Sequence, residues 1–254
     1  MGNLFDIAIY NPIYNLLIFI YNIVPDFGVA IILVTVFIKF LLIPLSKKQI
    51  ESQKKMQELQ PKIKEIQAKY KTDKEKQSRA MMELYKESKS NPFSGCLPMI
   101  VQLVFLIAIY RVLFNISQAG LVVNNADLYA FIQNPGQINK IFLGMVDLSS
   151  AINFSSLTLS SLPHIILVIL AAGAQFVQTK MMMAKQAVKP SKADEADFAQ
   201  IMSKQMLFLG PIMTLFIGIK FPAGLALYWL VSTAFMIIQQ KYMEKKEMAV
   251  VVAK

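Results

Sequence analysis

Five stretches of the chain are apolar enough to be considered membrane-spanning helices, and this feature limits the possible fold more than any other. A helix that crosses a bilayer needs roughly 20 residues at 1.5 Å each. The candidate spans cover residues 28–45, 97–117, 162–183, 205–219 and 221–240. The fourth is short, and the FPAG sequence where the last two meet leaves room only for a tight turn. We therefore interpret the last two spans as a hairpin.

The composition agrees with a membrane protein. Hydrophobic residues make up 55% of the chain and charged residues 17%, whereas soluble domains have about 45–50% and about 25%. The apolar content excludes a disordered chain, and the single cysteine, Cys96, excludes a disulfide scaffold. The net charge of +10 alone would permit nucleic-acid binding, but a basic surface does not account for the hydrophobicity. We expect an all-α polytopic membrane protein that binds no DNA.

The distribution of basic residues predicts the orientation. Residues 46–96 contain thirteen Lys or Arg and seven Asp or Glu, and residues 184–204 and 241–254 contain four basic residues each. Residues 1–27 contain none, and the loop 118–161 contains only Lys140. Since cytoplasmic loops are enriched in Lys and Arg, we expect the N-terminus and the loop 118–161 outside the cell. The segments 46–96 and 184–204 and the tail 241–254 are then cytoplasmic.

The segment 1–27, before the first span, is predicted to hold an interfacial helix on the outer surface of the membrane. Asn11 can cap a helix that has Pro12 at its first position. Asn11, Asn15 and Asn22 then recur near helical spacing and form one polar stripe. An apolar helix with such a stripe is typical of the interface. A true span over residues 3–24 is the alternative.

Residues 46–96 are predicted to form a charged, coiled-coil-like helical hairpin. Its first arm carries apolar residues near heptad spacing, namely Ile50, Met56, Leu59, Ile63, Ile66 and Tyr70. Pro61 is expected to kink this arm. Thr72 and Glu75 match a capping box that starts the second arm, and Asn91-Pro92 is expected to end it.

The sequence lacks the residue groupings of an enzyme active site. No Asp or Glu lies in the five predicted spans, so no intramembrane carboxylate is available for proteolysis or a proton relay. There is no phosphate-binding loop, and one cysteine with one histidine cannot form a Cys–His metal cluster. That histidine, His164, is expected to be an interfacial aromatic residue. We expect no enzyme activity, no cofactor and no metal.

Lys39 is the charge inside a predicted span that most needs an explanation. It lies about 16 Å along the helix from Gly28 and about 9 Å before Leu45, hence in the inner half of the membrane. A lysine at this depth costs roughly 2.5–3.5 kcal/mol on insertion scales. Two explanations remain open from this residue alone. Its side chain extends to the cytoplasmic headgroups, or it lies in a water-filled cavity open to the cytoplasm.

Further polar residues within the spans favour the cavity. Each of them alone is commonly an interhelical hydrogen-bonding group or an interfacial belt residue. Together they predict one polar groove. They are Thr35 on the first span, Gln102 on the second, Gln175 and Gln178 on the third, and Trp229, Ser232 and Thr233 on the fifth.

Three blocks of sequence give a resemblance to a known family. They are MQELQPKIKEIQAKYK, NPFSGCLPMIVQ and FPAGLALYWLVSTAFMIIQQKY, which begin at Met56, Asn91 and Phe221. Their content, order and spacing resemble the YidC-type membrane protein insertases over nearly the whole chain. The chain is similar to the short members of this family, which lack a large extracytoplasmic domain.

The resemblance implies a function for the groove. In the family, a five-helix core encloses a groove that is open to the cytoplasm and to lipid. A positively charged groove residue on the first core helix receives nascent membrane proteins. Lys39 matches that position, where arginine is usual, and Thr35, Trp229 and Gln175 match further groove positions. The resemblance implies a multi-pass protein of the bacterial cell membrane, with the ribosome, signal-recognition components or the Sec translocon as partners of the segment 46–96 and the tail.

Two other functions use the same residues. A small channel or solute transporter could line its pathway with the polar residues of the spans, although we find no internal repeat of the kind that transporters often have. A membrane anchor for a cytoplasmic partner would need the spans only for attachment. The leading hypothesis is an insertase that releases the apolar spans of its substrates sideways into lipid.

Overall fold

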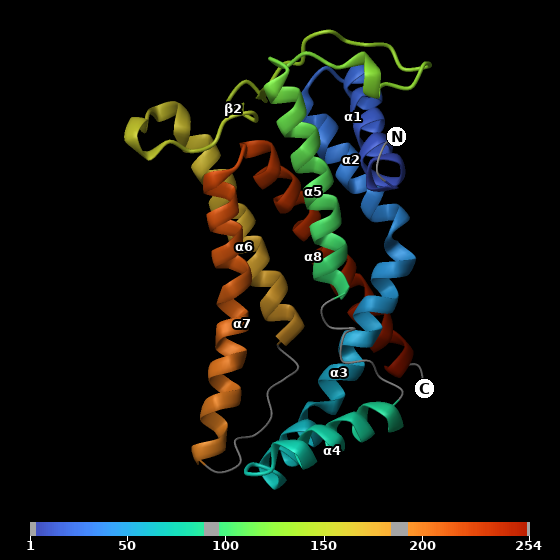
Figure 1. The fold of residues 1–254 in the computed structure, drawn as a ribbon, viewed down its shortest axis with the longest axis vertical. Coiled ribbons are helices and arrows are strands. Elements are labelled where there is room, and N and C mark those ends of the chain that lie inside the picture. Colours follow the sequence, from blue (N-terminus) through green and yellow to red (C-terminus); the bar gives the residue numbers. More distant parts are fainter. Residues whose placement is uncertain (1–3, 89–96, 184–192, 253–254) are drawn as a thin grey trace.

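The computed structural model describes residues 4–88, 97–183 and 193–252, and these form an elongated helical bundle (Figure 1). Its helices are α1 (Asn11–Ile23), α2 (Phe27–Leu41), α3 (Ile43–Lys69), α4 (Lys74–Glu87), α5 (Leu97–Gln118), α6 (Leu162–Met183), α7 (Ala193–Lys220) and α8 (Ala223–Val252). A π-helical turn, η1 (Asp6–Tyr10), precedes α1. Between α5 and α6 lie three short 3₁₀ turns, η3 (Asn125–Asp127), η4 (Phe154–Ser156) and η5 (Leu159–Ser161). The same loop holds an antiparallel pair of strands, β1 (Ile141–Phe142) and β2 (Val146–Asp147), in which Phe142 pairs with Val146.

Three segments of the described chain are long and apolar enough to cross a membrane, namely Ile100–Gln118, Leu159–Met182 and Ala223–Lys245. The helices α2 and α3 together meet the same criteria as a pair bent by 64°. The apolar part of α7, Leu207–Lys220, is shorter. The structure thus confirms the prediction of a mostly helical chain with membrane-span candidates, of which the described residues contain three to four. The predicted total of five spans stays a prediction.

The bend between α2 and α3 lies inside the predicted span 28–45. Leu42 separates the two helices, and Pro44 occupies the first turn of α3. Proline is tolerated in the first turn of a helix. In the interior it kinks or breaks the helix, because its ring clashes with the carbonyl one turn earlier. The amide of Ser46 donates to the carbonyl of Leu42 at 2.8 Å and restarts the helical pattern.

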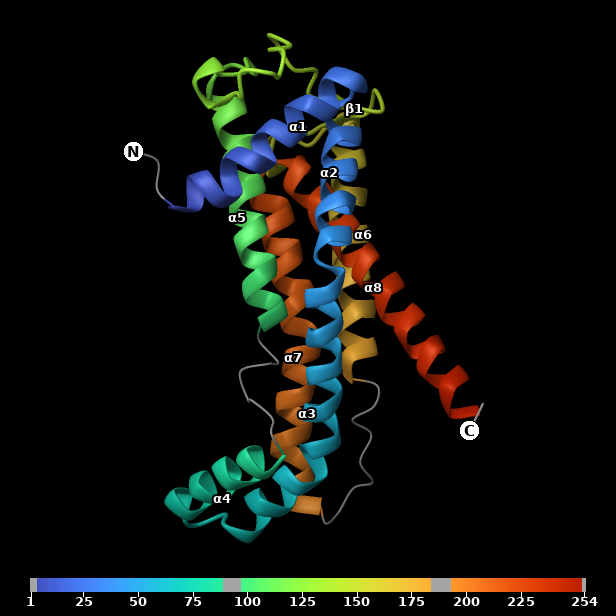
Figure 2. The same ribbon diagram turned by 90° about the vertical axis from the view of Figure 1, so that its right-hand side faces the viewer.

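The helix α8 forms the centre of the bundle. It packs against α6, α2, α5 and α7, while α6 also packs along α7, and α1 against α2 (Figures 1 and 2). Fully buried aliphatic side chains hold these contacts together, including Ile18 of α1, Ile31 and Val34 of α2, and Ile109 and Val112 of α5. Within a bilayer such contacts stabilise the bundle by close van der Waals packing, because lipid tails are as apolar as these side chains. The FPAG junction is the expected tight connection, since α7 ends at Lys220 and α8 begins at Ala223.

One end of the bundle, here called the loop end, is made by residues 119–161 and the helices that meet them. Asp26 caps α2 by accepting hydrogen bonds from the amides of Gly28 and Val29 at 2.9 and 3.0 Å. The ring of Phe142 lies where a Gly28 side chain would be, 2.1 Å from the position of a Cβ atom, so only glycine fits there. The first amide of α8, on Ala223, donates to the carbonyl of Ser150 at 3.1 Å. The loop thereby positions the starts of α2 and α8.

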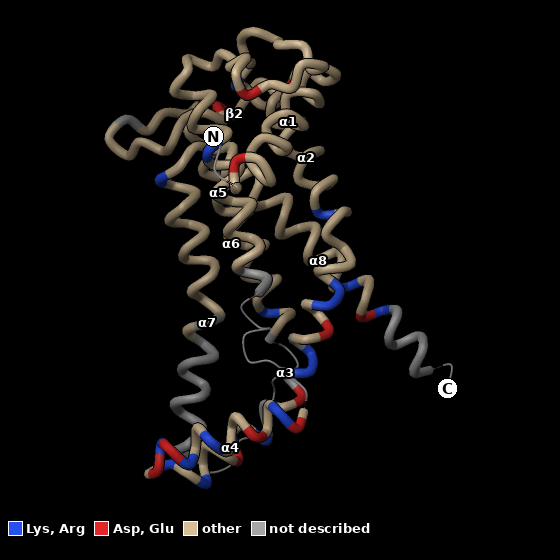
Figure 3. The backbone as a smooth tube through the Cα atoms, turned by 45° about the vertical axis from the view of Figure 1, so that its right-hand side comes forward, with Lys and Arg blue, Asp and Glu red and all other residues tan. Residues whose placement is uncertain are grey.

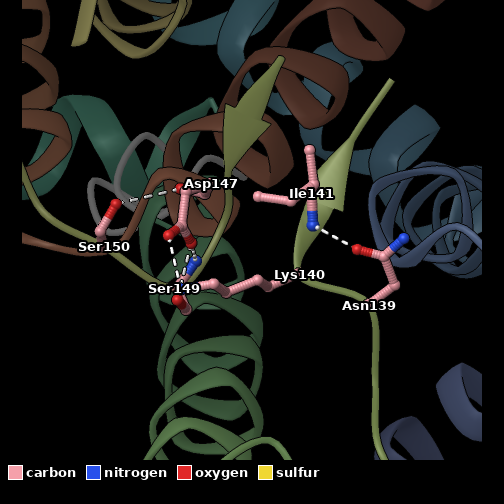
Figure 4. Close-up of polar contacts among 6 residues, drawn as sticks. All are labelled: Asn139, Lys140, Ile141, Asp147, Ser149 and Ser150. Carbon is pink, nitrogen blue, oxygen red and sulfur yellow. Dashed lines mark hydrogen bonds and ion pairs between the residues drawn. The ribbon is translucent and has the colours of Figure 1, made fainter. Parts of the chain in front are cut away.

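Asp147 organises the β1–β2 strands of this loop (Figure 4). Its carboxylate accepts hydrogen bonds from the amide and the hydroxyl of Ser149 at 2.9 and 2.7 Å and pairs with the Lys140 ammonium at 2.8 Å. Burial alone would raise the pKa of Asp147, but these donors outweigh it and hold the pKa below its usual value. Asp147 and His164 also line a cavity of about 330 Å³ under the strands.

The opposite end, here called the charged end, carries most of the charge. Figure 3 shows Lys, Arg, Asp and Glu gathered on α3, α4 and the last part of α8, far from the loop end. A turn over residues 70–73 connects α3 and α4, which pack against each other. The complete hairpin stays a prediction, because its expected end at Asn91-Pro92 lies outside the described residues.

Two local predictions are wrong. Asn11 does not cap α1, because the helical path already begins before it and runs through η1. Thr72 and Glu75 do not form the capping box of the second arm, since Asp73 caps α4 by accepting a hydrogen bond from the Lys76 amide at 3.0 Å. His164 is buried, with Nε2 at 3.1 Å from the carbonyl oxygen of Gly218, and its place at the membrane interface stays a prediction.

Candidate functional site

Lys39 lies in a polar cluster that joins three helices. Its Nζ donates to Oε1 of Gln102, on α5, at 3.0 Å. The same oxygen accepts a hydrogen bond from the hydroxyl of Ser232, on α8, at 2.9 Å. Among the residues that the structure describes, no Asp or Glu forms an ion pair with Lys39. Within this described part of the chain, the lysine is thus held by a neutral amide, and no carboxylate balances its charge.

A second cluster lies between α6 and α8. Oε1 of Gln175 accepts a hydrogen bond from Nε1 of Trp229 at 3.0 Å and a longer one, of 3.5 Å, from the hydroxyl of Thr233. Thr179, one turn along α6, donates to the Gln175 carbonyl at 2.9 Å. As in the first cluster, one glutamine oxygen accepts hydrogen bonds from two donors. In this cluster both donors lie on α8.

The two clusters meet at α8. Ser232 belongs to the first and Thr233 to the second, and consecutive residues of a helix are about 100° apart around its axis. The lysine cluster therefore faces α2 and α5, while the tryptophan cluster faces α6. The structure brings together six of the eight predicted residues: Lys39, Gln102 and Ser232 in one cluster, and Gln175, Trp229 and Thr233 in the other.

Thr35 and Gln178 do not join these clusters. The buried hydroxyl of Thr35 donates to the carbonyl of Ile31, in its own helix, at 2.6 Å. This is the usual way in which a threonine satisfies its hydroxyl inside a helix. The side chain of Gln178 is half-buried and forms no hydrogen bond with the described residues. Both residues remain candidates for the groove by position only.

The sequence reasoning missed several residues around the clusters. Thr179 is one, and Gly210 of α7 is another, because a Cβ atom there would lie 3.4 Å from Nε2 of Gln175. Closer to the charged end, the side chains of Gln49 and Gln239 are buried, and Nε2 of Gln49 and both amide atoms of Gln239 have no hydrogen-bond partner among the described residues. Polar residues in the segment around Gln49 were not considered because they lie beyond the predicted span.

The comparisons with known proteins match this chain to one family. The model of the family described as 60Kd inner membrane protein matches residues 19–249. A membrane protein insertase YidC from Fusobacterium nucleatum is 34% identical over 242 residues, which cover 94% of this chain and 98% of that protein. The chain belongs to this family. The match confirms the resemblance that the three sequence blocks indicated.

Other members of the family are longer. A membrane protein insertase YidC from Geotalea uraniireducens is 35% identical over 241 residues, which cover 94% of this chain but 38% of that protein. The chain thus spans little more than a third of the length of several relatives that it matches. The solved structure described as an active YidC insertase crystal structure has a TM-score of 0.57 at 24% identity and covers 95% of this chain and 47% of that one. This likeness supports the shared helical fold.

Proposed function

We propose that this protein is a membrane protein insertase in which Lys39 receives polar or acidic parts of nascent chains. The observation that carries the proposal is the neutral environment of Lys39, which donates to Gln102 and has no carboxylate partner among the described residues. A cation without a counter-ion inside a candidate span attracts an acidic segment more strongly than a paired one does. The relatives are named as insertases rather than as enzymes, in agreement with the expectation from the sequence.

The physical step is a partial transfer across the membrane. A polar segment that reaches Lys39 crosses only the remaining apolar thickness, and the adjoining apolar span of the substrate then moves into lipid because its transfer is favourable. No nucleotide is required for this step. The glutamine oxygens of both clusters offer acceptors that a substrate can use in place of Trp229, Ser232 or Lys39 itself.

The topology belongs to the same proposal. Five spans, an extracytoplasmic loop end and a cytoplasmic charged end fit the positive-inside pattern, and the separation of charge along the bundle supports that orientation (Figure 3). The groove would then open toward the cytoplasm. The helices α3 and α4 and the end of α8 would face the ribosome or a translocon partner, where their lysines meet RNA phosphates or acidic surfaces.

Complementation of insertase-depleted cells tests the role of Lys39. We expect Lys39→Glu to reduce insertion of a single-span substrate with an acidic leading segment by about tenfold or more, since about 1.4 kcal/mol of lost attraction is tenfold. Lys39→Arg keeps the charge and is the matched control, with insertion close to that of the wild type. Normal insertion by both Lys39→Ala and Lys39→Glu would show that the charge is not used.

A further inference from the structure

The helix α5 carries another charge within a candidate span, Arg111, that the sequence reasoning passed over in favour of Lys39. Arg111 lies inside the candidate span Ile100–Gln118. It is seven residues before Gln118, the last residue of α5, which places its backbone about 10 Å from the loop end of the helix. Its side chain is 40% exposed. A charged residue within a span needs a partner or access to water.

The partner of Arg111 comes from the amino end of the chain. Its Nη1 lies 2.5 Å from Oδ1 of Asp6, the first residue of η1. The guanidinium carbon also lies 5.6 and 5.0 Å from the ring centroids of Phe5 and Tyr10, within the range of cation–π attraction. One turn nearer the loop end, Asn115 donates to the hydroxyl of Tyr10 at 2.9 Å. The amino end of the chain is therefore fastened along α5.

These contacts form a descending series. Asn22 and Asn15 donate to the carbonyls of Gln133 and Asp127, which lie in the loop beyond the end of α5. Tyr10 contacts Asn115 inside the span, and Asp6 contacts Arg111 one turn deeper. The partners thus move from the loop into the span as the residue number falls. Figure 2 shows the same slope, with α1 running from its junction with α2 down beside α5 toward the N-terminus.

The lowest part of the segment is apolar and uncovered. Leu4 is 79% exposed and Ile7 is 61% exposed. Lipid acyl chains are the surroundings in which such side chains are stable at this depth, whereas a helix lying flat at the interface would hold both ends at the level of the headgroups.

We propose that residues 4–23 form a helix tilted into the leaflet on the side of the loop end, with Leu4 and Ile7 against acyl chains, and that the Asp6–Arg111 pair makes this insertion possible. Pairing brings the two charges into the leaflet as a net neutral unit, which costs less than burying either charge alone. The segment is then neither flat on the surface nor a span. The inference needs only that α5 spans the membrane, so it stands apart from the insertase proposal.

Depth-dependent fluorescence quenching tests the tilt. Ile7 and Ile23 are a matched pair, because they are the same residue at opposite ends of the segment and are 61% and 66% exposed. In a Cys96→Ser background, Ile7→Cys and Ile23→Cys are each labelled with an environment-sensitive dye. The full chain is then reconstituted in phosphatidylcholine–phosphatidylglycerol vesicles. We expect nitroxides on the acyl chains to quench the Ile7 probe several-fold more than the Ile23 probe, and aqueous iodide to quench in the opposite order. Equal quenching of both probes would overturn the proposal.

Neutralising the charges tests the pair. Asp6→Asn removes one charge without touching α5 and leaves Arg111 unpaired, so we expect the Ile7 probe to lose most of its acyl-chain quenching. Arg111→Gln leaves Asp6 unpaired and is expected to do the same. The double variant carries no charge there and should regain the depth of the wild type. Lys140→Gln, which removes a charge elsewhere at the loop end, is the control and should leave the depth of the Ile7 probe unchanged. An Ile7 probe that keeps its depth in both single variants rules out the pair as its cause.

Discussion

The loop end and the two clusters on α8 satisfy their buried polar groups in different ways. At the loop end, side chains bond to the backbone: Asn15 joins Asp127 and Tyr129, and the hydroxyl of Tyr21 accepts from the amide of Asn139 at 2.8 Å. In the clusters, side chains bond to side chains, and two glutamine oxygens each serve two donors. Backbone partners are fixed in place, whereas side-chain partners can rotate away. The loop end is thus suited to a structural cap and the clusters to an exchangeable binding surface.

The charges differ in the same way. Lys140 and Arg111, near the loop end, are paired with Asp147 and Asp6. Lys39 has a neutral glutamine instead. A paired charge contributes to the fold, while a charge left without a counter-ion remains available for a ligand. The comparison therefore predicts that substitutions at the loop end change stability and that substitutions in the clusters change function.

The largest expected effect on stability is at Asn15. This residue is 1% exposed, and its amide donates to the Asp127 carbonyl and accepts from the Tyr129 amide at 2.8 and 2.7 Å. Asn15→Leu leaves both backbone groups without a partner and should destabilise the protein by about 3 kcal/mol. Thermal unfolding in detergent measures this. Asn22→Leu, whose side chain is exposed with one bond to the loop, should cost less than about 1 kcal/mol. Equal losses would contradict the division between cap and binding surface.

Gln102→Glu should separate function from stability. The new carboxylate would lie near 3.0 Å from Nζ of Lys39, the distance of the present hydrogen bond, and would neutralise that charge. We expect insertion of acidic substrates to fall by about tenfold, equivalent to about 1.4 kcal/mol, while the unfolding temperature stays the same or rises. Gln175→Glu is the control, since Trp229 and Thr233 offer it no cation, and it should lower the unfolding temperature. Normal insertion by Gln102→Glu would mean that Lys39 can act even when a carboxylate neutralises its charge.

The tryptophan cluster can be followed by its own fluorescence, because Trp229 is the single tryptophan of the chain. Gln175→Leu removes the acceptor of its Nε1 and should cost about 1–2 kcal/mol for the donor left unpaired. The emission should shift to shorter wavelength as the hydrogen bond is lost. Gln178→Leu, three residues along the same helix and outside the cluster, should change neither quantity by a measurable amount. A shift in Gln178→Leu as large as in Gln175→Leu would indicate that the two glutamines share one site.

Sequence reasoning identified six of the residues in the clusters because a polar side chain inside an apolar stretch is costly and therefore conspicuous. Lys39 and Gln102 stood out for that reason. Which of them pair could not be known, since the contacts join residues 54 to 130 positions apart. Gln175 and Gln178 illustrate the limit: helical spacing gave them a common face, but the position of α8 decides which one bonds.

The local errors have local causes. Asn11 had the residue type of a helix cap, but the chain before it is already helical, so no free amides remained for it to accept from. Asp73 competes with Thr72 for the same turn and caps α4 as a charged acceptor, which is stronger than a hydroxyl. Arg111 was as conspicuous inside its predicted span as Lys39, but its pairing could not be predicted, because Asp6 is 105 residues away and belongs to a segment that was expected at the surface.

The smallest expected effect is a pH dependence of the stability of the β1–β2 strands, which comes from Asp147. It tests the comparison of the loop end with the clusters, because Asp147 belongs to a paired charge of the loop end. Its folded pKa is held below the ordinary value of 3.8 by Lys140 and Ser149 after the opposing effect of burial. A lowered folded pKa gives stability that is present above the unfolded pKa and is lost as the pH falls through the folded one. Because both side chains of the ion pair are partly exposed, we expect less than about 1 kcal/mol.

Amide hydrogen exchange of β1 and β2 between pH 5 and pH 3 measures this effect, after correction for the intrinsic exchange rates. Protection should decrease as the pH falls in the wild type. Asp147→Asn should show weaker protection at pH 5 and little further change, because it has no carboxylate to protonate. Lys140→Met keeps the Ser149 donors and should show an intermediate dependence. If Asp147→Asn follows the wild-type profile, the carboxylate does not hold the strands, and the loop end owes its order to the asparagine and tyrosine contacts with α1.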